Sequence, residues 1–151
     1  MGRRSVTVIP YHLLLSIKMK KVLTVDFDDT LAATITSGWG GSSLKPIPRV
    51  MNFVFGKVRS EDWEAHIVTF RSEEDKQEVI DFIKGYKLPI KSVVCTSSKN
   101  KVPFLKKLNS KLHVDDSVEV CTLCIMAGID VLLVDHGQEK NNTTAKWIPK
   151  I

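Results

Sequence analysis

Three carboxylates follow directly on a short apolar run near the start of the chain. Val22 to Val25 have the composition of a buried strand, and Asp26, Asp28 and Asp29 come just after it. Because side chains alternate along a strand, Asp26 and Asp28 are predicted to converge on one side while Asp29 points away. Two carboxylates that close repel each other unless a cation or a proton lies between them. Oxygen ligands of this kind suit Mg2+, which commonly also binds substrate phosphate. The alternative is that Asp28, Asp29 and Thr30 turn the chain and cap a following helix.

Polar residues also end three further predicted strands. These strands cover Glu64 to Ser72, Pro89 to Cys95 and Lys111 to Val114. The polar residues at their ends are, in chain order, Thr69 and Arg71, then Lys99 and Lys101, then Asp115 and Asp116. Ligands of open α/β sheets bind at the carboxyl ends of the strands, so these groups are candidates for one common site.

The elements between these residues predict how they are positioned. Amphipathic or capped helical patterns follow Pro48, Ser72, Pro103 and Ser117, and Asp130 to Val134 forms a fifth strand. Strands that alternate with helices predict an α/β fold with one doubly wound, Rossmann-like, five-stranded parallel sheet and helices on both faces. All strand carboxyl ends then lie on one edge, where the polar residues should meet.

The segment from Leu31 to Pro48 is rich in Thr, Ser and Gly and contains Trp39. This composition predicts a mobile loop or a small hairpin beside the site. Trp39 could stack on a ring of the substrate, or it could anchor the loop.

The length of 151 residues fits a single domain. We expect residues 1–18 to be an N-terminal extension and residues 19–151 to form the domain. Arg3 and Arg4 followed by an apolar run superficially suggest a signal peptide, but a small-residue cleavage site is missing and the run is too short to span a membrane. The net charge is +5, and residues 1–18 contribute three of these positive charges without any acid. This is a weak basis for nucleic-acid binding.

The three cysteines, Cys95, Cys121 and Cys124, cannot all pair. An odd number without a clear export signal fits a reducing compartment, so a cytoplasmic location is expected. Cys121 and Cys124 form a single C-x-x-C, which could be a redox pair or half of a zinc site. Buried thiols on a helix face are the favoured interpretation. His113 and His136 have no partners at metal-binding spacing.

With these residues in order, the chain resembles the haloacid dehalogenase superfamily of phosphohydrolases over about Lys21 to Asp135. The matching motifs are Asp26-Phe-Asp-Asp-Thr30, then Thr69, then Lys101 with Lys99 as the alternative, then Asp115-Asp116. The first motif is the most specific, and the four in this order carry the resemblance together. A receiver domain does not fit, because its phosphoacceptor follows the third strand, and no acid does so here.

The resemblance implies a Mg2+-dependent phosphatase that works through an aspartyl-phosphate. Asp26 would be the nucleophile and Asp28 the general acid and base. Thr69 and Lys101 would hold the phosphoryl oxygens. The implied Mg2+ ligands are Asp26, the backbone carbonyl of Asp28 and Asp116, with Asp115 in support. The gaps between the motifs leave no room for a separate cap domain, so the protein would be of the small capless type.

Each later motif also has a structural explanation. Thr69 is a common strand residue, Lys99 and Lys101 could be solvated loop charges, and Asp115 and Asp116 could favour a helix N-terminus. For Arg71, the sequence leaves open whether it contacts substrate or pairs with Glu73 or Glu74.

The end of the chain is faintly similar to small nucleotidases of this superfamily, in Asp135-His-Gly, Asn141-Asn142 and Trp147-Ile148. The expected substrate is therefore a nucleotide or another small phosphomonoester. A polynucleotide 3′-phosphatase that acts on nucleic-acid ends and a non-catalytic binding module are the alternatives. No membrane partner is expected, and the sequence makes no prediction of the oligomeric state.

Overall fold

The computed structural model describes Pro10, residues 20–137 and residues 146–151. The predicted extension at residues 1–18, apart from Pro10, lies outside the described residues, and so do Asn141 and Asn142.

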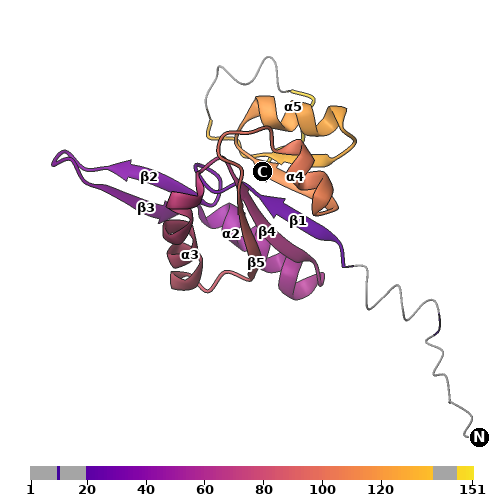
Figure 1. The fold of residues 1–151 in the computed structure, drawn as a ribbon, viewed down its shortest axis with the longest axis horizontal. Helices are drawn as coiled ribbons and strands as arrows, with labels where there is room; N and C mark the ends of the chain where they lie inside the picture. The colour runs from indigo at the N-terminus through magenta and orange to yellow at the C-terminus, as the bar shows by residue number, and fades with distance from the viewer. Residues whose placement is uncertain (1–9, 11–19, 138–145) are drawn as a thin grey trace, which may run out of the picture.

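A five-stranded parallel sheet with the order β5-β4-β1-β6-β7 forms the centre of the molecule (Figure 1). The strands are β1 (Val22–Val25), β4 (Glu64–Thr69), β5 (Ile90–Cys95), β6 (Ser110–Asp115) and β7 (Asp130–Leu133). All four residues of β1 are buried, as expected for the central strand of a parallel sheet that is covered on both faces. The predicted five-stranded, doubly wound sheet is confirmed.

Helices pack into two separate hydrophobic clusters. Helices α2 (Pro48–Phe55) and α3 (Lys76–Gly85) contribute to one cluster, while α4 (Val102–Lys107) and α5 (Val118–Met126) contribute to the other. The short elements η1 (Gly56–Ser60) and η2 (Glu73–Asp75) adjoin α2 and α3. Both clusters include sheet residues, so the sheet is covered on its two faces. None of the helices in the described ranges is long and apolar enough to cross a membrane.

Local sequence accounts for the helix starts. Pro48 lies in the first turn of α2, where a missing backbone N–H costs nothing and the fixed φ angle suits the helix. Ser117 caps α5, because its Oγ accepts a hydrogen bond of 3.2 Å from the backbone N–H of Val120. Cys121 and Cys124 are fully buried on α5, which confirms that they are buried thiols.

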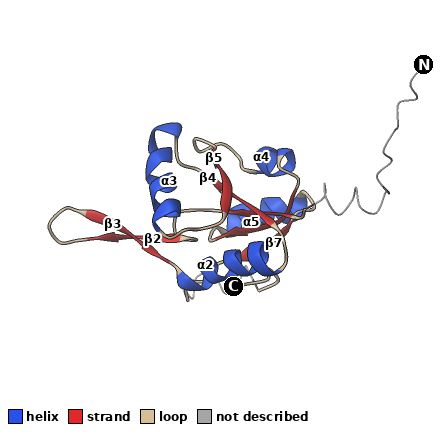
Figure 2. Ribbon diagram, turned by 90° about the horizontal axis from the view of Figure 1, so that it is seen from below, coloured by secondary structure: helices blue, strands red, loops and turns tan. Residues whose placement is uncertain are grey.

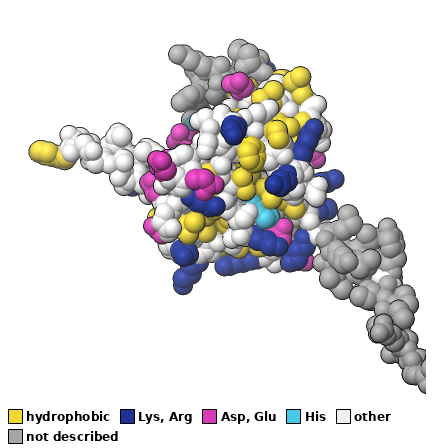
Figure 3. Space-filling view, in the orientation of Figure 1, with side chains coloured by type: hydrophobic (Ala, Val, Ile, Leu, Met, Phe, Trp, Pro, Cys, Tyr) yellow, Lys and Arg dark blue, Asp and Glu magenta, His cyan; other side chains and the backbone are white. Residues whose placement is uncertain are grey.

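The glycine-rich segment forms an antiparallel hairpin of β2 (Ala32–Thr36) and β3 (Ser42–Pro46). It projects from the body in both ribbon views, and a hydrophobic group lies at its far end (Figures 1, 2 and 3). Trp39 is 98% exposed between the two strands, so the interpretation that it anchors the loop is wrong. The chain enters the hairpin through Asp29, whose φ of 57° is left-handed. The turn proposed for this stretch exists, but a strand follows it instead of the alternative helix.

The end of the chain adds to the sheet beside β7. The backbone N–H of Leu133 donates to Pro149 O at 2.8 Å, and the N–H of Ile151 donates to Leu133 O at 2.9 Å. Ile148 is buried in the same cluster as α4 and α5. This closing segment therefore protects the edge of the sheet at β7.

Candidate active site

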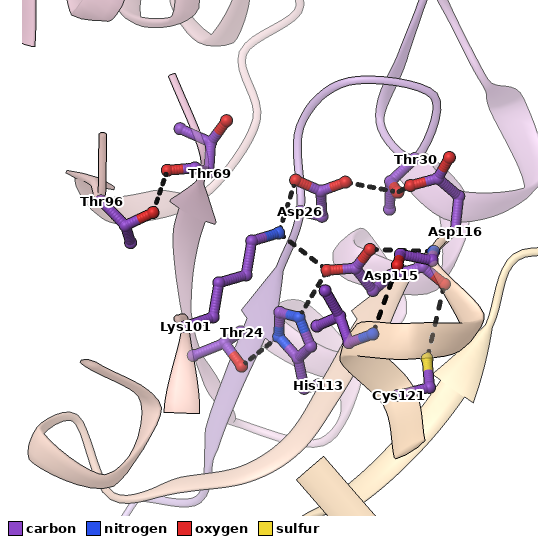
Figure 4. A network of polar contacts seen from close by, with 12 residues as sticks. Thr24, Asp26, Thr30, Thr69, Thr96, Lys101, His113, Asp115, Asp116 and Cys121 are labelled. Carbon is purple, nitrogen blue, oxygen red and sulfur yellow. Dashed lines mark hydrogen bonds and ion pairs between the residues drawn. The ribbon is translucent and has the colours of Figure 1, made fainter. Parts of the chain in front are cut away.

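Asp26 lies just beyond β1, at the carboxyl edge of the sheet (Figure 4). Its backbone N–H donates to Val114 O of the neighbouring β6 at 2.9 Å, which continues the ladder by one residue and fixes the position of the carboxylate. Oδ1 accepts a hydrogen bond from Lys101 Nζ at 2.8 Å, and Oδ2 accepts one from Thr30 Oγ1 at 3.2 Å. The side chain is thereby oriented at both oxygens.

Two more acids reach the same place from the end of β6. Carboxylate oxygens of Asp26, Asp115 and Asp116 lie within 4.8 Å of one another. The predicted meeting of the first and fourth motifs is therefore present in the structure. Its cause is the strand order, because β6 pairs directly with β1.

Lys101 is the cation of this cluster. Its Nζ lies 2.8 Å from Asp26 Oδ1 and 2.7 Å from Asp115 Oδ2, and the residue is only 2% exposed. Burial opposes its charge, but the two carboxylates outweigh burial and raise the pKa of Lys101. Lys99, the other candidate, is exposed. The structure thus brings Lys101, and not Lys99, to the acids.

His113 is a member of the cluster that the sequence analysis missed. It is fully buried on β6, where Nε2 lies 2.9 Å from Asp115 Oδ2 and Nδ1 lies 2.8 Å from Thr24 Oγ1. Its spacing from Asp115 could have revealed this role, because the two residues lie two positions apart on β6 and such residues point to the same side of a strand. The histidine therefore supports Asp115 and links it to Thr24 of β1 (Figure 4).

The carboxylates differ in their tendency to ionise. Burial and the charge of Asp115 raise the pKa of Asp26. Burial opposes ionisation of Asp115 too, but the His113 hydrogen bond and the Lys101 charge lower its pKa to about 2. Burial and the charges of Asp26 and Asp115 raise the pKa of Asp116 to about 7. One lysine thus leaves the negative charge of the cluster incompletely compensated.

This donor set fits a hard divalent cation. Asp115 is already bound by Lys101, His113 and the N–H of Ser117, which donates to Asp115 Oδ1 at 3.0 Å. Within the described part of the chain, the hydrogen-bond contact of Asp116 is a long one of 3.5 Å to Thr30 Oγ1, whose single proton is shared with the closer Asp26 Oδ2. Asp26 and Asp116 are therefore the carboxylates with the most capacity to bind an ion, and oxygen ligands are those that Mg2+ prefers.

Asp28 is not a member of the cluster in which carboxylate oxygens of Asp26, Asp115 and Asp116 lie within 4.8 Å of one another, and its convergence with Asp26 stays a prediction. The regular alternation ends with β1 at Val25, and Asp28 is bridged to Ala32 instead. Its carboxylate binds Arg71 in a bidentate pair, with Arg71 Nε to Oδ2 at 2.9 Å and Nη2 to Oδ1 at 2.8 Å. Charge-assisted pairs of this geometry hold a carboxylate in one orientation.

Arg71 is the second functional candidate whose role only the structure reveals. Besides Asp28 it binds Glu78 through Nη1 at 2.8 Å, and neither Glu73 nor Glu74 is its partner. The hydrogen bonds that Arg71 donates to the carboxylates of Asp28 and Glu78 raise its pKa, although burial opposes this. Its guanidinium also lies over the ring of Phe27, 5.1 Å from the ring centroid. Arg71 is thus a fixed support for Asp28.

Thr69 lies at the end of β4 and is fully buried. Its Oγ1 accepts a hydrogen bond of 3.3 Å from the backbone N–H of Arg71, and its carbonyl accepts from Thr96 Oγ1 at 3.2 Å (Figure 4). The hydroxyl proton of Thr69 has no acceptor among the described residues, so it is available for a hydrogen bond to a ligand.

No protein-family model matches the chain, and no curated protein matches it. Several solved structures are similar to the chain. A Vibrio cholerae protein provisionally named 3-deoxy-D-manno-octulosonate 8-phosphate phosphatase is 18% identical, with a TM-score of 0.57 over 95% of this chain and 81% of that chain. The enzyme of that name from Moraxella catarrhalis, solved with magnesium, phosphate and a KDO molecule, is 19% identical, with a TM-score of 0.54 over 80% of this chain and 70% of that chain.

A protein from Streptomyces avermitilis, provisionally named a HAD family hydrolase, is also similar. It is 14% identical, with a TM-score of 0.52 over 80% of this chain and 70% of that chain. At these identities the likeness shows the fold, which is the one that the four motifs implied. The chain has the haloacid dehalogenase-like fold, and no separate cap domain is present in its described residues.

Proposed function

We propose that the chain is a Mg2+-dependent phosphatase of the haloacid dehalogenase type, working through an aspartyl-phosphate. The observation that carries the proposal is the cluster in which Lys101 lies between Asp26 and Asp115, with Asp116 beside them. An oriented carboxylate next to a buried cation and a group of metal-binding oxygens is suited to attack on a phosphoryl group. Phosphoryl transfer is catalysed mainly by positioning and countercharge, and these residues supply both.

In this proposal, Asp26 is the nucleophile. Its carboxylate oxygen attacks phosphorus, the bond from phosphorus to the leaving oxygen breaks, and the phosphoryl group remains on Asp26. Water then attacks the phosphorus and releases phosphate and free Asp26. The Thr69 hydroxyl donates a hydrogen bond to a phosphoryl oxygen, and Lys101 offsets negative charge on Asp26 and on the phosphoryl group.

Asp28 is the general acid and base of the proposed reaction. It gives a proton to the leaving oxygen in the first step and takes one from the attacking water in the second, a role worth ~10²–10⁴ in rate. The bidentate hydrogen bonds from the Arg71 guanidinium hold the Asp28 carboxylate in place, so Arg71 is a positioning residue.

Asp26, Asp116 and the backbone carbonyl of Asp28 would hold the Mg2+, with Asp115 supporting them. When bound, the ion would neutralise charge on the phosphoryl oxygens and on the carboxylates. The fit rests on the geometry of the donors, because carboxylate oxygens of Asp26, Asp115 and Asp116 lie within 4.8 Å of one another.

The proposed substrate is a small phosphomonoester, with a nucleotide favoured. Because the described residues contain no cap domain, the carboxyl edge of the sheet is accessible to such molecules. The 3-deoxy-D-manno-octulosonate 8-phosphate phosphatases of the same fold make sugar-acid phosphates a further class to test. The three free, buried thiols support a cytoplasmic location.

The test is a phosphatase screen over nucleotides, sugar phosphates, 3-deoxy-D-manno-octulosonate 8-phosphate and 3′-phosphorylated oligonucleotides, with and without Mg2+. We expect turnover of a small phosphomonoester that EDTA abolishes and that Asp26→Asn lowers by at least about 10³-fold. Asp62→Asn is the matched control, because this exposed acid pairs only with Lys20, at 3.1 Å, among the described residues. Equal rates for Asp26→Asn and the wild type would exclude the nucleophile assignment, and metal binding without any turnover would favour a binding module.

A further inference from the structure

A small pocket of about 360 Å³ lies beside the candidate active site. The residues that matter for its chemistry are Phe70, Asn100, Lys101, Ser117, Glu119 and Leu123. Its volume is at the lower end of the range for small-ligand sites.

The pocket shares its walls with the phosphate-handling residues. Phe70 follows Thr69 directly, Asn100 precedes Lys101, and Ser117 follows Asp116. Lys101 itself belongs to both the pocket lining and the acidic cluster. A molecule whose phosphate lies at the cluster can therefore extend its remaining part into this pocket.

One part of the pocket is apolar and exposed. Phe70 is 41% exposed and Leu123 is 39% exposed, although both are large hydrophobic side chains. Hydrophobic side chains also gather on the visible surface over α5, which carries Leu123 (Figure 3). The Phe70 ring lies over Lys101 Nζ, 4.7 Å from the centroid, so one face of the ring is occupied by the lysine. Its exposed surface is available to a flat ring of a ligand.

The polar part of the pocket offers one acceptor and one donor. Glu119 is exposed in the first turn of α5 and has no hydrogen bond or ion pair within the described part of the chain. Asn100 Oδ1 accepts from the N–H of Val102 at 3.0 Å, and the amide NH2 of Asn100 has no acceptor within the part of the chain that the structure describes. Together they match a ring whose edge carries both a donor and an acceptor.

We propose that this pocket binds a planar heteroaromatic ring that is part of the leaving group of the substrate. The substrate is then a nucleoside monophosphate with an amino-bearing base. Phe70 stacks on the base, Glu119 accepts from its exocyclic amine, and Asn100 donates to a ring acceptor. This inference rests on the proposed phosphatase function, and it assigns the residues that select the substrate.

The experiment compares CMP and UMP with acetyl phosphate, which has no ring, as substrates of the Mg2+-loaded protein. Phe70→Leu keeps an apolar cover over Lys101 but removes the stacking ring. It should lower the ratio of kcat/KM for CMP to kcat/KM for acetyl phosphate by roughly tenfold, mainly through KM. Glu119→Gln should lower the preference for CMP over UMP by about fivefold or more, because an amide is a weaker acceptor for the base amine.

Two matched variants control for changes outside the pocket. Tyr86→Leu removes another exposed aromatic ring, 45% exposed at the end of α3, and Glu74→Gln removes an exposed acid near the start of that helix. Both should keep the wild-type substrate ratios. Thermal unfolding of all variants checks that each is folded.

The outcomes separate the two proposals. Turnover of acetyl phosphate and CMP with unchanged ratios in Phe70→Leu and Glu119→Gln would overturn the pocket assignment and leave the phosphatase proposal standing. Absence of any phosphatase activity would overturn the proposed function. Calorimetric titration of CMP into Asp26→Asn and into Asp26→Asn with Phe70→Leu tests the pocket independently of turnover. Equal CMP affinity in the two variants, or no binding to either, would also overturn the assignment.

Discussion

Replacement of Lys101 by Met is the most direct test of the buried cluster. The ammonium group lies 2.8 Å from Asp26 Oδ1 and 2.7 Å from Asp115 Oδ2. At an effective dielectric constant of ~20, each contact corresponds to an attraction of ~6 kcal/mol, and the cost of burying the charges offsets most of it. Methionine fills a similar volume but leaves the two acids without their cation.

The net cost of leaving buried charges unpaired in this way is ~3–5 kcal/mol. We therefore expect the free energy of unfolding of Lys101→Met to fall by that amount in EDTA at pH 7, measured by urea denaturation and circular dichroism. Added Mg2+ should stabilise this variant more than it stabilises the wild type, because the ion then supplies the missing positive charge.

Lys99→Met is the matched control, since Lys99 is an exposed lysine only two residues away. Its free energy of unfolding should stay within ~0.5 kcal/mol of the wild-type value. If the free energies of unfolding of Lys101→Met and Lys99→Met in EDTA differed by less than ~1 kcal/mol, the buried ion pairs of Lys101 would not stabilise the fold as we infer.

Three further predictions follow from other parts of the structure. Arg71→Met should lower kcat roughly 10–100-fold with little change in thermal stability, because Asp28 loses its bidentate support; an unchanged kcat in steady-state assays would contradict this. Asp116 has a pKa of about 7 in the folded protein against 3.8 as its ordinary value, so its ionisation costs stability as pH rises between these values. In EDTA at pH 8, the free energy of unfolding of Asp116→Asn should therefore exceed that of the wild type by about 1–3 kcal/mol, whereas at pH 4 the two should be equal. The variant should also lose the Mg2+-dependent rise in Tm. A lower free energy of unfolding than the wild type at pH 8, measured by chemical denaturation, would contradict this prediction. Trp39→Ala should change the free energy of unfolding by less than ~0.5 kcal/mol, since the side chain is 98% exposed; a larger loss by urea denaturation would mean that the ring packs on the protein.

The sequence determined the class of fold and the order of its elements. The apolar run before Asp26, the proline at the start of α2 and the serine that caps α5 each act within a few residues of their own position. Local signals of this kind depend on neighbours along the chain, so they can be recognised without a structure. The rule that strand carboxyl ends share one edge then predicted that Asp26 and Asp116 would meet.

The alternation rule applies only as far as the strand extends. It predicted that Asp28 lies on the same side as Asp26, but the extended backbone stops at Val25, the chain turns into the hairpin, and Asp28 pairs with Arg71. Alternation is a property of regular extended backbone, so it gives no direction for a side chain beyond the last strand residue.

Only the tertiary structure decided which distant residues became partners. Lys101 reaches Asp26 across 75 positions of sequence, and Arg71 reaches Asp28 across 43. The family resemblance favoured Lys101 and kept Lys99 as the alternative, and Arg71 had nearer acids in Glu73 and Glu74. These pairings follow from the strand order, which brings the ends of β4, β5 and β6 close to the end of β1. They also follow from burial, because a buried lysine between two carboxylates is more favourable than any of these buried charges alone.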